Sequence, residues 1–276
     1  MRRGLLFLIA VCTLCVYAAC KKEQPAVNVV ITPPPVKALY PDSVFFINAS
    51  DKNMISPVSA VTGSYTCFPE GLNIDQNTGV FDVNSSETGL KYKITFTATE
   101  TGTIRVAFVT VSGINYKDKI FNLANGDSIA APIYNAKSNA AVPQINNGTG
   151  FDQNSGCKDV GIEVSPIDGT INLAKTVRDQ GIDTGSTQEV KLQYRINDGS
   201  HEALNGLDVK VYFYRTASEI PQYLQDILTD RKTTILSAIP QSQGMFTASV
   251  SSFAALSSSK VKPGRPRPPC IIVVSR

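Results

Sequence analysis

Tryptophan is absent from this chain of 276 residues, which also contains only one histidine and three methionines. A single imidazole leaves little room for the acid–base and metal chemistry that histidine usually performs in enzymes. Charged residues make up only 18% of the chain, and the net charge of +3 is small, which argues against a general nucleic-acid-binding protein. Because 42% of the residues are apolar, the chain can form one or two globular cores, and disorder over most of its length is excluded.

No apolar run reaches the ~20 residues that a membrane-spanning helix needs. The apolar run at residues 5–17 follows Arg2 and Arg3 and is succeeded by small residues, a layout typical of a secretory signal. We therefore predict a signal peptide over residues 1–20 that contributes nothing to the fold. Removing its two arginines lowers the net charge from +3 to +1.

The signal ends in Ala-Ala-Cys, which resembles the lipobox of bacterial lipoproteins. The resemblance implies that Cys20 is lipidated and becomes the first residue after cleavage, since several acyl chains on one cysteine give a stable anchor. Tyr17 departs from the family, which usually has leucine there, so an ordinary signal with Cys20 as a plain thiol is the alternative. We expect an outer-membrane protein, facing the periplasm or the cell surface.

Residues 21–36 contain Pro25 and three consecutive prolines at 33–35. Proline fixes φ and lacks an amide donor, so this segment predicts an extended tether between the membrane and the folded part. Beyond it, short runs rich in β-branched and aromatic residues are separated by Gly, Asn, Asp and Ser. Their alternation predicts an all-β fold; the runs are 43–48, 91–99, 103–111, 189–196 and 207–214.

An internal repeat is the most informative pattern in the sequence. Residues 67–83 align without gaps on residues 157–173, so that Gly71 and Gly79 fall 90 positions before Gly161 and Gly169. Residues 91–100 then match residues 189–198. Each unit predicts a β-hairpin with a glycine at a positive-φ turn position. The spacing suits two tandem immunoglobulin-like β-sandwiches, which we place at residues 37–113 and 114–276.

The first copy resembles the bacterial immunoglobulin-like modules of the dystroglycan-type cadherin-like group. The residues that carry this resemblance are Pro69-Glu70-Gly71-Leu72-Asn73-Ile74-Asp75, Thr78-Gly79-Val80, Thr88-Gly89 and Lys93–Thr99. The second copy keeps Gly161, Gly169 and residues 197–199 but lacks the Pro-x-Gly start. Membership in this group implies a stalk or adhesive unit without catalytic activity, and it implies no particular ligand.

The last third of the chain departs from the strand pattern. Apolar residues near helical spacing between Ser218 and Pro240 predict a short helical insertion in the second module. Residues 245–250 and 270–274 are predicted as closing strands. A strand at 270–274 would bring Cys270 into the same module as Cys157, so we predict a disulfide between these two, although spacing alone does not determine connectivity.

No metal or cofactor site is expected. Beyond the predicted signal peptide there is no Cys-x-x-Cys pair, and only His201 could add a nitrogen ligand. The loops that begin at Asp75 and Asp152 resemble the start of a calcium loop but lack its later ligands, so turns closed by their own side chains are the simpler interpretation. Gly-Asp-Ser at Ser128 and Asp-Gly-Ser-His at His201 resemble the motifs of GDS-type esterases. The interval between them is too short for that family's α/β sheet, so this hypothesis is a remote alternative.

Ligand contacts would come from exposed aromatic faces. Tyr116, Tyr134 and Tyr223 lie in the less regular segments and are the candidates, with burial in the core as the other reading. We expect a non-catalytic cell-envelope lipoprotein that displays immunoglobulin-like modules for adhesion or protein interaction. The alternative is a glycan-binding surface lipoprotein of an uptake system. The expected partners are the membrane, through the lipid, and an envelope protein or a glycan.

Overall fold

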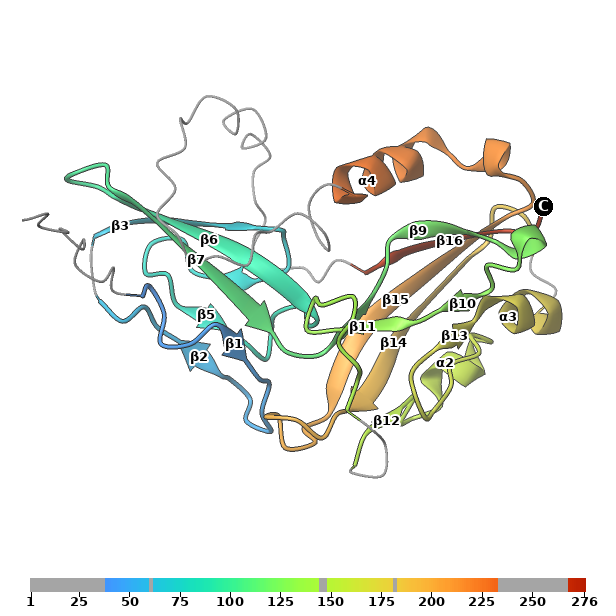
Figure 1. The fold of residues 1–276 in the computed structure, drawn as a ribbon, viewed down its shortest axis with the longest axis horizontal. Helices are drawn as coiled ribbons and strands as arrows, with labels where there is room; N and C mark the ends of the chain where they lie inside the picture. The colour runs from blue at the N-terminus through green and yellow to red at the C-terminus, as the bar shows by residue number, and fades with distance from the viewer. Residues whose placement is uncertain (1–37, 60–61, 144–147, 181–182, 233–267) are drawn as a thin grey trace, which may run out of the picture. The chain divides into compact units, whose positions relative to one another are not determined.

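Strands dominate the computed structural model, which describes residues 38–59, 62–143, 148–180, 183–232 and 268–276 (Figure 1). The helices in these ranges are few and short, so the predicted all-β class is confirmed. The predicted signal peptide, Cys20, the tether and the strand at 245–250 lie outside the described residues. From Ala38 onward the chain forms one compact unit, and its described residues form three separate hydrophobic clusters.

Two sheets enclose the core of the first half. One has the strand order β1 (Val44–Phe45), β7 (Ile104–Val111), β6 (Leu90–Ala98) and β3 (Gly63–Phe68), and the other has the order β2 (Met54–Ile55), β5 (Phe81–Asp82) and β4 (Asn73–Ile74). Every second residue of β6 is buried, from Leu90 to Ala98. These side chains share one cluster with Phe81 and Ile74 of the smaller sheet, so the core lies between the two sheets.

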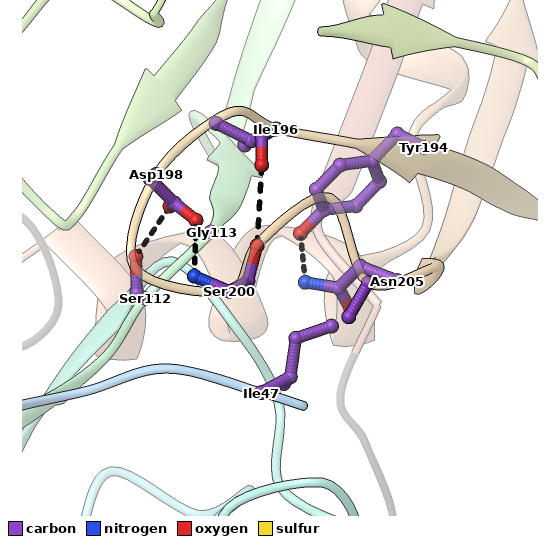
Figure 2. Close-up of a pocket in the computed structure, with 9 residues that line it drawn as sticks. Ile47, Ser112, Gly113, Tyr194, Ile196, Asp198, Ser200 and Asn205 are labelled. Atoms are coloured by element: carbon purple, nitrogen blue, oxygen red, sulfur yellow. Dashed lines mark hydrogen bonds between the residues drawn. The ribbon is translucent and has the colours of Figure 1, made fainter. Parts of the chain in front are cut away.

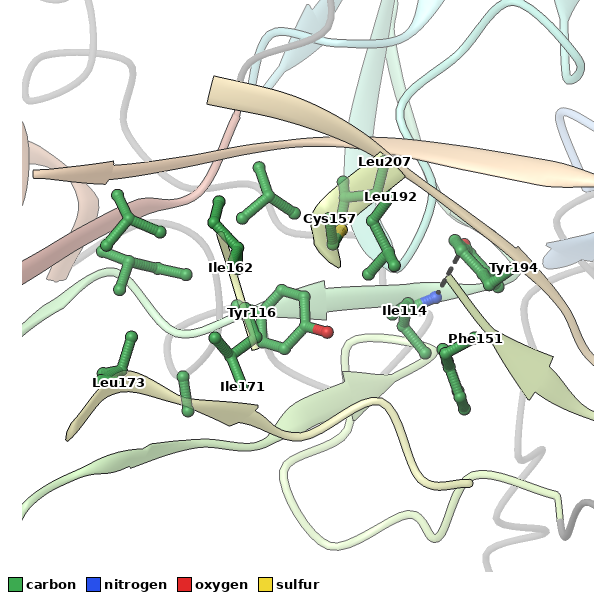
Figure 3. Packing of buried hydrophobic residues seen from close by; sticks show 14 of the residues in the cluster. Ile114, Tyr116, Phe151, Cys157, Ile162, Ile171, Leu173, Leu192, Tyr194 and Leu207 are labelled. Atoms are coloured by element: carbon green, nitrogen blue, oxygen red, sulfur yellow. Dashed lines mark hydrogen bonds between the residues drawn. The ribbon is translucent and has the colours of Figure 1, made fainter. Parts of the chain in front are cut away.

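A five-stranded sheet organises the second half, in the order β12 (Gly150–Phe151), β14 (Thr187–Arg195), β15 (Asn205–Tyr214), β16 (Cys270–Val274) and β9 (Lys119–Asn122). Two small antiparallel pairs face it: β8 (Ile114–Tyr116) with β11 (Pro132–Tyr134), and β10 (Ile129–Ala130) with β13 (Ile171–Asn172). The apolar side chains between them form the largest described cluster (Figure 3). The described helices are η1 (Leu123–Asn125), α2 (Gly156–Asp159), α3 (Leu173–Gln180), η3 (Ala217–Glu219) and α4 (Gln222–Lys232).

The predicted repeat of the turn is confirmed by its backbone hydrogen bonds. The N–H of Gly79 donates to the carbonyl of Asp75 at 2.8 Å, and 90 positions later the N–H of Gly169 donates to the carbonyl of Ser165 at 3.0 Å. The two glycines have φ angles of 71° and 72°. Both turns therefore need the left-handed conformation that glycine adopts at least cost.

A tyrosine closes each of these turns in the same way. The hydroxyl of Tyr40 donates to the carbonyl of Gly79 at 2.8 Å, and that of Tyr116 donates to the carbonyl of Gly169 at 2.5 Å. Both tyrosines are buried, so each bond satisfies two polar groups that water does not reach. A further contact repeats at the same spacing: Asn73 N donates to Ser86 Oγ, and Glu163 N donates to Thr176 Oγ1.

The structural repeat does not extend to the first residues of the aligned sequence segments. Cys67 lies in strand β3, whereas Cys157 lies in the short helix α2, so these aligned cysteines are not structurally equivalent. Helices α2 and α3 of the second half were not predicted. The predicted helical insertion is present as η3 and α4, and the predicted strand at residues 270–274 is present as β16.

Cys157 and Cys270 do not form the predicted disulfide. Side chains of a strand alternate between its two faces. Ile271 and Val273 of β16 point into the cluster that contains Cys157, whereas Cys270 points to the other face, beneath α4. The prediction placed both cysteines correctly in one half of the chain, but the five-stranded sheet separates them.

Candidate functional site

A network of hydrogen bonds joins the two halves where β7 passes into β8. The Oδ2 atom of Asp198 accepts hydrogen bonds from Ser112 Oγ at 3.0 Å and from Tyr134 Oη at 2.7 Å. Its Oδ1 atom accepts a hydrogen bond from the backbone N–H of Ser200 at 2.8 Å (Figure 2). One carboxylate therefore ties the turn between β14 and β15 to the end of β7 and to β11.

Tyr194 lies at the centre of the buried part of this joint between the two halves. Its side chain is 0% exposed, and its hydroxyl oxygen accepts hydrogen bonds from Ile114 N at 3.2 Å and Asn205 Nδ2 at 2.8 Å. Since two N–H donors occupy the oxygen, its own proton is donated to Thr88 Oγ1, 2.8 Å away. Burial raises the pKa of Tyr194 well above the ordinary value for tyrosine, so the hydroxyl remains a donor at physiological pH.

Close packing accompanies these hydrogen bonds. Gly113 has a φ of 141°, and a Cβ atom there would lie 2.5 Å from the Tyr194 hydroxyl. At Gly199 a Cβ atom would lie 2.7 Å from the ring of Phe46. Ala203, which belongs to the second half by sequence, is buried in the core cluster of the first half. The turn between β14 and β15 is therefore part of the packing of both halves.

A small pocket remains in the joint (Figure 2). Its volume is about 10 Å³, close to the lower limit for a single water molecule, whereas small-molecule sites usually measure hundreds of Å³. Its size allows no sugar or metabolite to enter. The lining residues are Ile47, Ser112, Gly113, Tyr194, Ile196, Asp198, Ser200, Ala203 and Asn205.

The three tyrosines predicted as ligand contacts have different environments. Tyr116 is 1% exposed and closes the turn at Gly169, so the prediction of a ligand contact is wrong for it. Tyr134 is half-buried and donates to Asp198, and burial raises its pKa to about 12, so it serves the joint. Tyr223 on α4 is 56% exposed and is the one member of the three that a ligand could reach.

The esterase motifs are not brought together. Strand β9 ends at Asn122, which aligns through β16 with Tyr214 at the end of β15, and Ser128 follows this end of the sheet. His201 lies in the turn that precedes β15, at the opposite end. A serine nucleophile needs a base within hydrogen-bonding distance, so this arrangement does not support the esterase alternative.

The two aspartates that begin calcium-like loops accept hydrogen bonds from backbone N–H groups a few residues away. Asp75 Oδ1 accepts hydrogen bonds from the backbone N–H groups of Thr78 and Asn77, which lower its pKa. The carboxylate of Asp152 accepts from the first residues of α2. The interpretation as side-chain-closed turns is thus confirmed for Asp75, while Asp152 caps a helix. Among the residues that the structure describes, no cluster of three or more His, Cys, Asp and Glu side chains could hold a metal ion.

The joint between the two halves was not predicted. Thr88 and Tyr194 lie in the segments that carry the family resemblance and the repeat, but nothing in those segments indicated a contact between residues 106 positions apart. A polar hydroxyl at Tyr194, in a strand position that the alternation predicts to be buried, was the available signal, because buried hydroxyls need partners.

Within the described ranges, no helix is long and apolar enough to cross a membrane. No model of a known protein family matches the chain, and a search of curated proteins finds no match.

Proposed function

We propose that this chain is a non-catalytic, lipid-anchored protein of the bacterial cell envelope that displays two tandem immunoglobulin-like sandwiches for adhesion or protein interaction. The observation that carries the proposal is the buried joint at Tyr194, where hydroxyl, amide and backbone groups of both halves satisfy one another. Such a joint suppresses bending between the modules, so that together they act as one stiff spacer.

The immunoglobulin-like assignment is supported by the layers of each half. In the first half two sheets share one core, and in the second half a five-stranded sheet faces two short strand pairs across another. Sandwiches of this type hold their core between two sheets in about 100 residues. The duplicated turns with their tyrosine contacts support a tandem origin of the two modules.

Anchoring at Cys20 is tested by cell fractionation. The Cys20→Ala variant is expected to leave the membrane fraction for the soluble fraction, because the acyl chains supply the membrane affinity. Cys67→Ala provides the matched control, since it removes a different cysteine and is expected to stay with the membrane. Tight membrane association of Cys20→Ala, equal to that of the control, would refute the lipid anchor.

Display is tested by treating intact cells with a protease. An adhesive protein on the cell surface is expected to be cut while a periplasmic marker protein stays intact. Cleavage that occurs only after rupture of the outer membrane would assign the protein to the periplasmic face, where its partners would be other envelope proteins, and would exclude adhesion to external surfaces.

Glycan binding is a second candidate function, favoured by the exposure of Tyr223 on α4. Affinity electrophoresis on common polysaccharides measures it directly. If the candidate holds, the full chain is retarded and Tyr223→Ala abolishes the retardation, whereas Ile167→Ala, which removes another side chain that is 60% exposed, has no effect. Absence of retardation for the unmodified chain would remove this function.

A further inference from the structure

Strand β16 has no counterpart among the described residues of the first half. There, β1 pairs directly with β7 in parallel, through Val44 with Thr110 and Phe45 with Val111. In the second half the corresponding strands are β9, which follows Tyr116 as β1 follows Tyr40, and β15. They do not pair with each other, because β16 lies between them and is parallel to both.

The position of β16 is fully enclosed. All five of its residues are buried; Ile271 and Val273 enter the large cluster, and the other three side chains pack beneath α4. At its start, Cys270 N donates to Asp118 Oδ1 at 2.6 Å. At its end, Ser275 N donates to the carbonyl of Tyr214 at 3.2 Å. Withdrawal of β16 would leave a slot with two unpaired strand edges and apolar contacts on both faces.

The connection to β16 is long. Residues 233–269 separate it from α4, a length of 37 residues, which at full extension reaches about 125 Å. Of the other connections in this sheet, the one between β14 and β15 is short, and those from β9 to β12 and from β12 to β14 run through described strands and helices. Among the strands of this sheet, β16 therefore has the covalent connection that least restricts it to the sheet of its own chain.

We propose that the slot between β9 and β15 also accepts β16 from a second copy of this chain, so that neighbouring copies are joined by exchange of this strand. The exchanged strand makes the same hydrogen bonds and apolar contacts in either copy, as in domain swapping. The ratio of exchanged to self-contained chains then depends on the protein concentration, relative to the effective concentration of β16 that the connection provides within one chain. This inference goes beyond the proposed function and does not depend on the lipid anchor.

A cross-linking experiment on the full chain tests the exchange. Cys270 is the register partner of Lys210 on β15, and strands ~4.8 Å apart are within the Cα separation that a disulfide allows. An acceptor chain carries Lys210→Cys with Cys270→Ala, and a donor chain keeps Lys210 and Cys270. After joint refolding and mild oxidation, a linkage between positions 210 and 270 can form only between two chains. All chains carry Cys67→Ser to remove a competing thiol.

The matched control is an acceptor with Glu189→Cys and Cys270→Ala. Glu189 pairs with Lys210 across β14 and β15 and is its salt-bridge partner, so both acceptors lose the same ion pair, but position 189 lies one strand farther from β16. Exchange predicts that linkage to position 210 increases with total protein concentration and exceeds linkage to position 189 at least tenfold. Equal linkage at both positions would overturn the proposal. It would also be overturned if no linkage between chains formed at position 210 while a chain with Lys210→Cys and native Cys270 formed the bond within itself.

A second measurement needs no substitution in the protein. A fluorescent peptide with the sequence of residues 268–276 is refolded with the unmodified full chain, and bound peptide is measured by gel filtration. Incorporation of this peptide, but not of one carrying Ile271→Asp and Val273→Asp, supports a slot that takes the strand from outside. Equal binding of the two peptides, or no binding of either, contradicts it.

Discussion

Replacing Tyr194 by phenylalanine tests whether the joint stabilises the protein. The ring is kept, so the apolar contacts of Tyr194 with its cluster, including the stacked ring of Phe151, stay in place. Only the hydroxyl is lost. The N–H of Ile114 and the amide of Asn205 then lose their acceptor, and the hydroxyl of Thr88 loses a partner. Ile114 and Thr88 are buried.

The magnitude follows from these three contacts. A typical buried hydrogen bond contributes about 0.5–1.5 kcal/mol net, and a buried group left without a partner costs about 1–3 kcal/mol. Partial relaxation of Asn205 and Thr88 lowers the total, because their side chains can rotate whereas the backbone N–H of Ile114 cannot. We expect Tyr194→Phe to reduce the free energy of unfolding by about 2–4 kcal/mol, a large part of the roughly 5–15 kcal/mol typical of a folded protein.

Urea unfolding followed by far-UV circular dichroism measures the change. Tyr65→Phe is the matched control, because Tyr65 is also buried in a strand and its hydroxyl has no hydrogen bond to a described residue; a change below about 0.5 kcal/mol is expected for it. If Tyr194→Phe changes the stability no more than Tyr65→Phe does, the hydroxyl network does not stabilise the joint. A double variant with Thr88→Val isolates the contact between the two halves.

Three further predictions concern the repeat, the turn at Asp75 and β16. Tyr40→Phe and Tyr116→Phe each remove one hydrogen bond to a turn carbonyl and should each cost about 1 kcal/mol in urea unfolding; an effect at one site alone would show that the two contacts are not equivalent. Hydrogen bonds lower the folded-state pKa of Asp75 below its ordinary value of 3.8, so the charged form adds stability that is present above pH ~4 and lost as the pH falls through the folded pKa. The stability difference between the unmodified chain and Asp75→Asn should shrink over that range, and a constant difference from pH 7 to pH 2 would contradict this. Deletion of residues 268–276 should abolish hydrogen-exchange protection in β9 and β15 but spare β6 and β7, whose core is separate; a uniform loss would show that the halves unfold together.

Local patterns allowed part of this fold to be predicted. The alternation at Ile94, Phe96 and Ala98 specified a strand with one buried face, because the side-chain period of a strand is two. The glycines of the repeated turn, such as Gly79, indicated positive φ, because a residue with Cβ is strained there. Both conclusions depend only on neighbours in the chain, and the structure confirms both.

Contacts between distant segments were not predictable in the same way. Tyr116 was a candidate ligand contact with burial in the core as the other reading, and it is buried because residues of β9, β10 and β13 share its cluster. The site at the joint was missed, since Thr88 and Tyr194 are 106 residues apart and meet only when both halves are folded. Local propensity carries no information about such pairs.

The sequence by itself determined the β class, the duplicated turn and the C-terminal strand, because these follow from side-chain period and backbone sterics over a few residues. Tertiary structure alone decided that β16 enters between β9 and β15, that Cys157 and Cys270 lie on opposite faces of one sheet, and that Tyr194 reaches the first half. These features depend on which apolar faces pack against each other, and burial is favourable without regard to the separation of its partners along the chain.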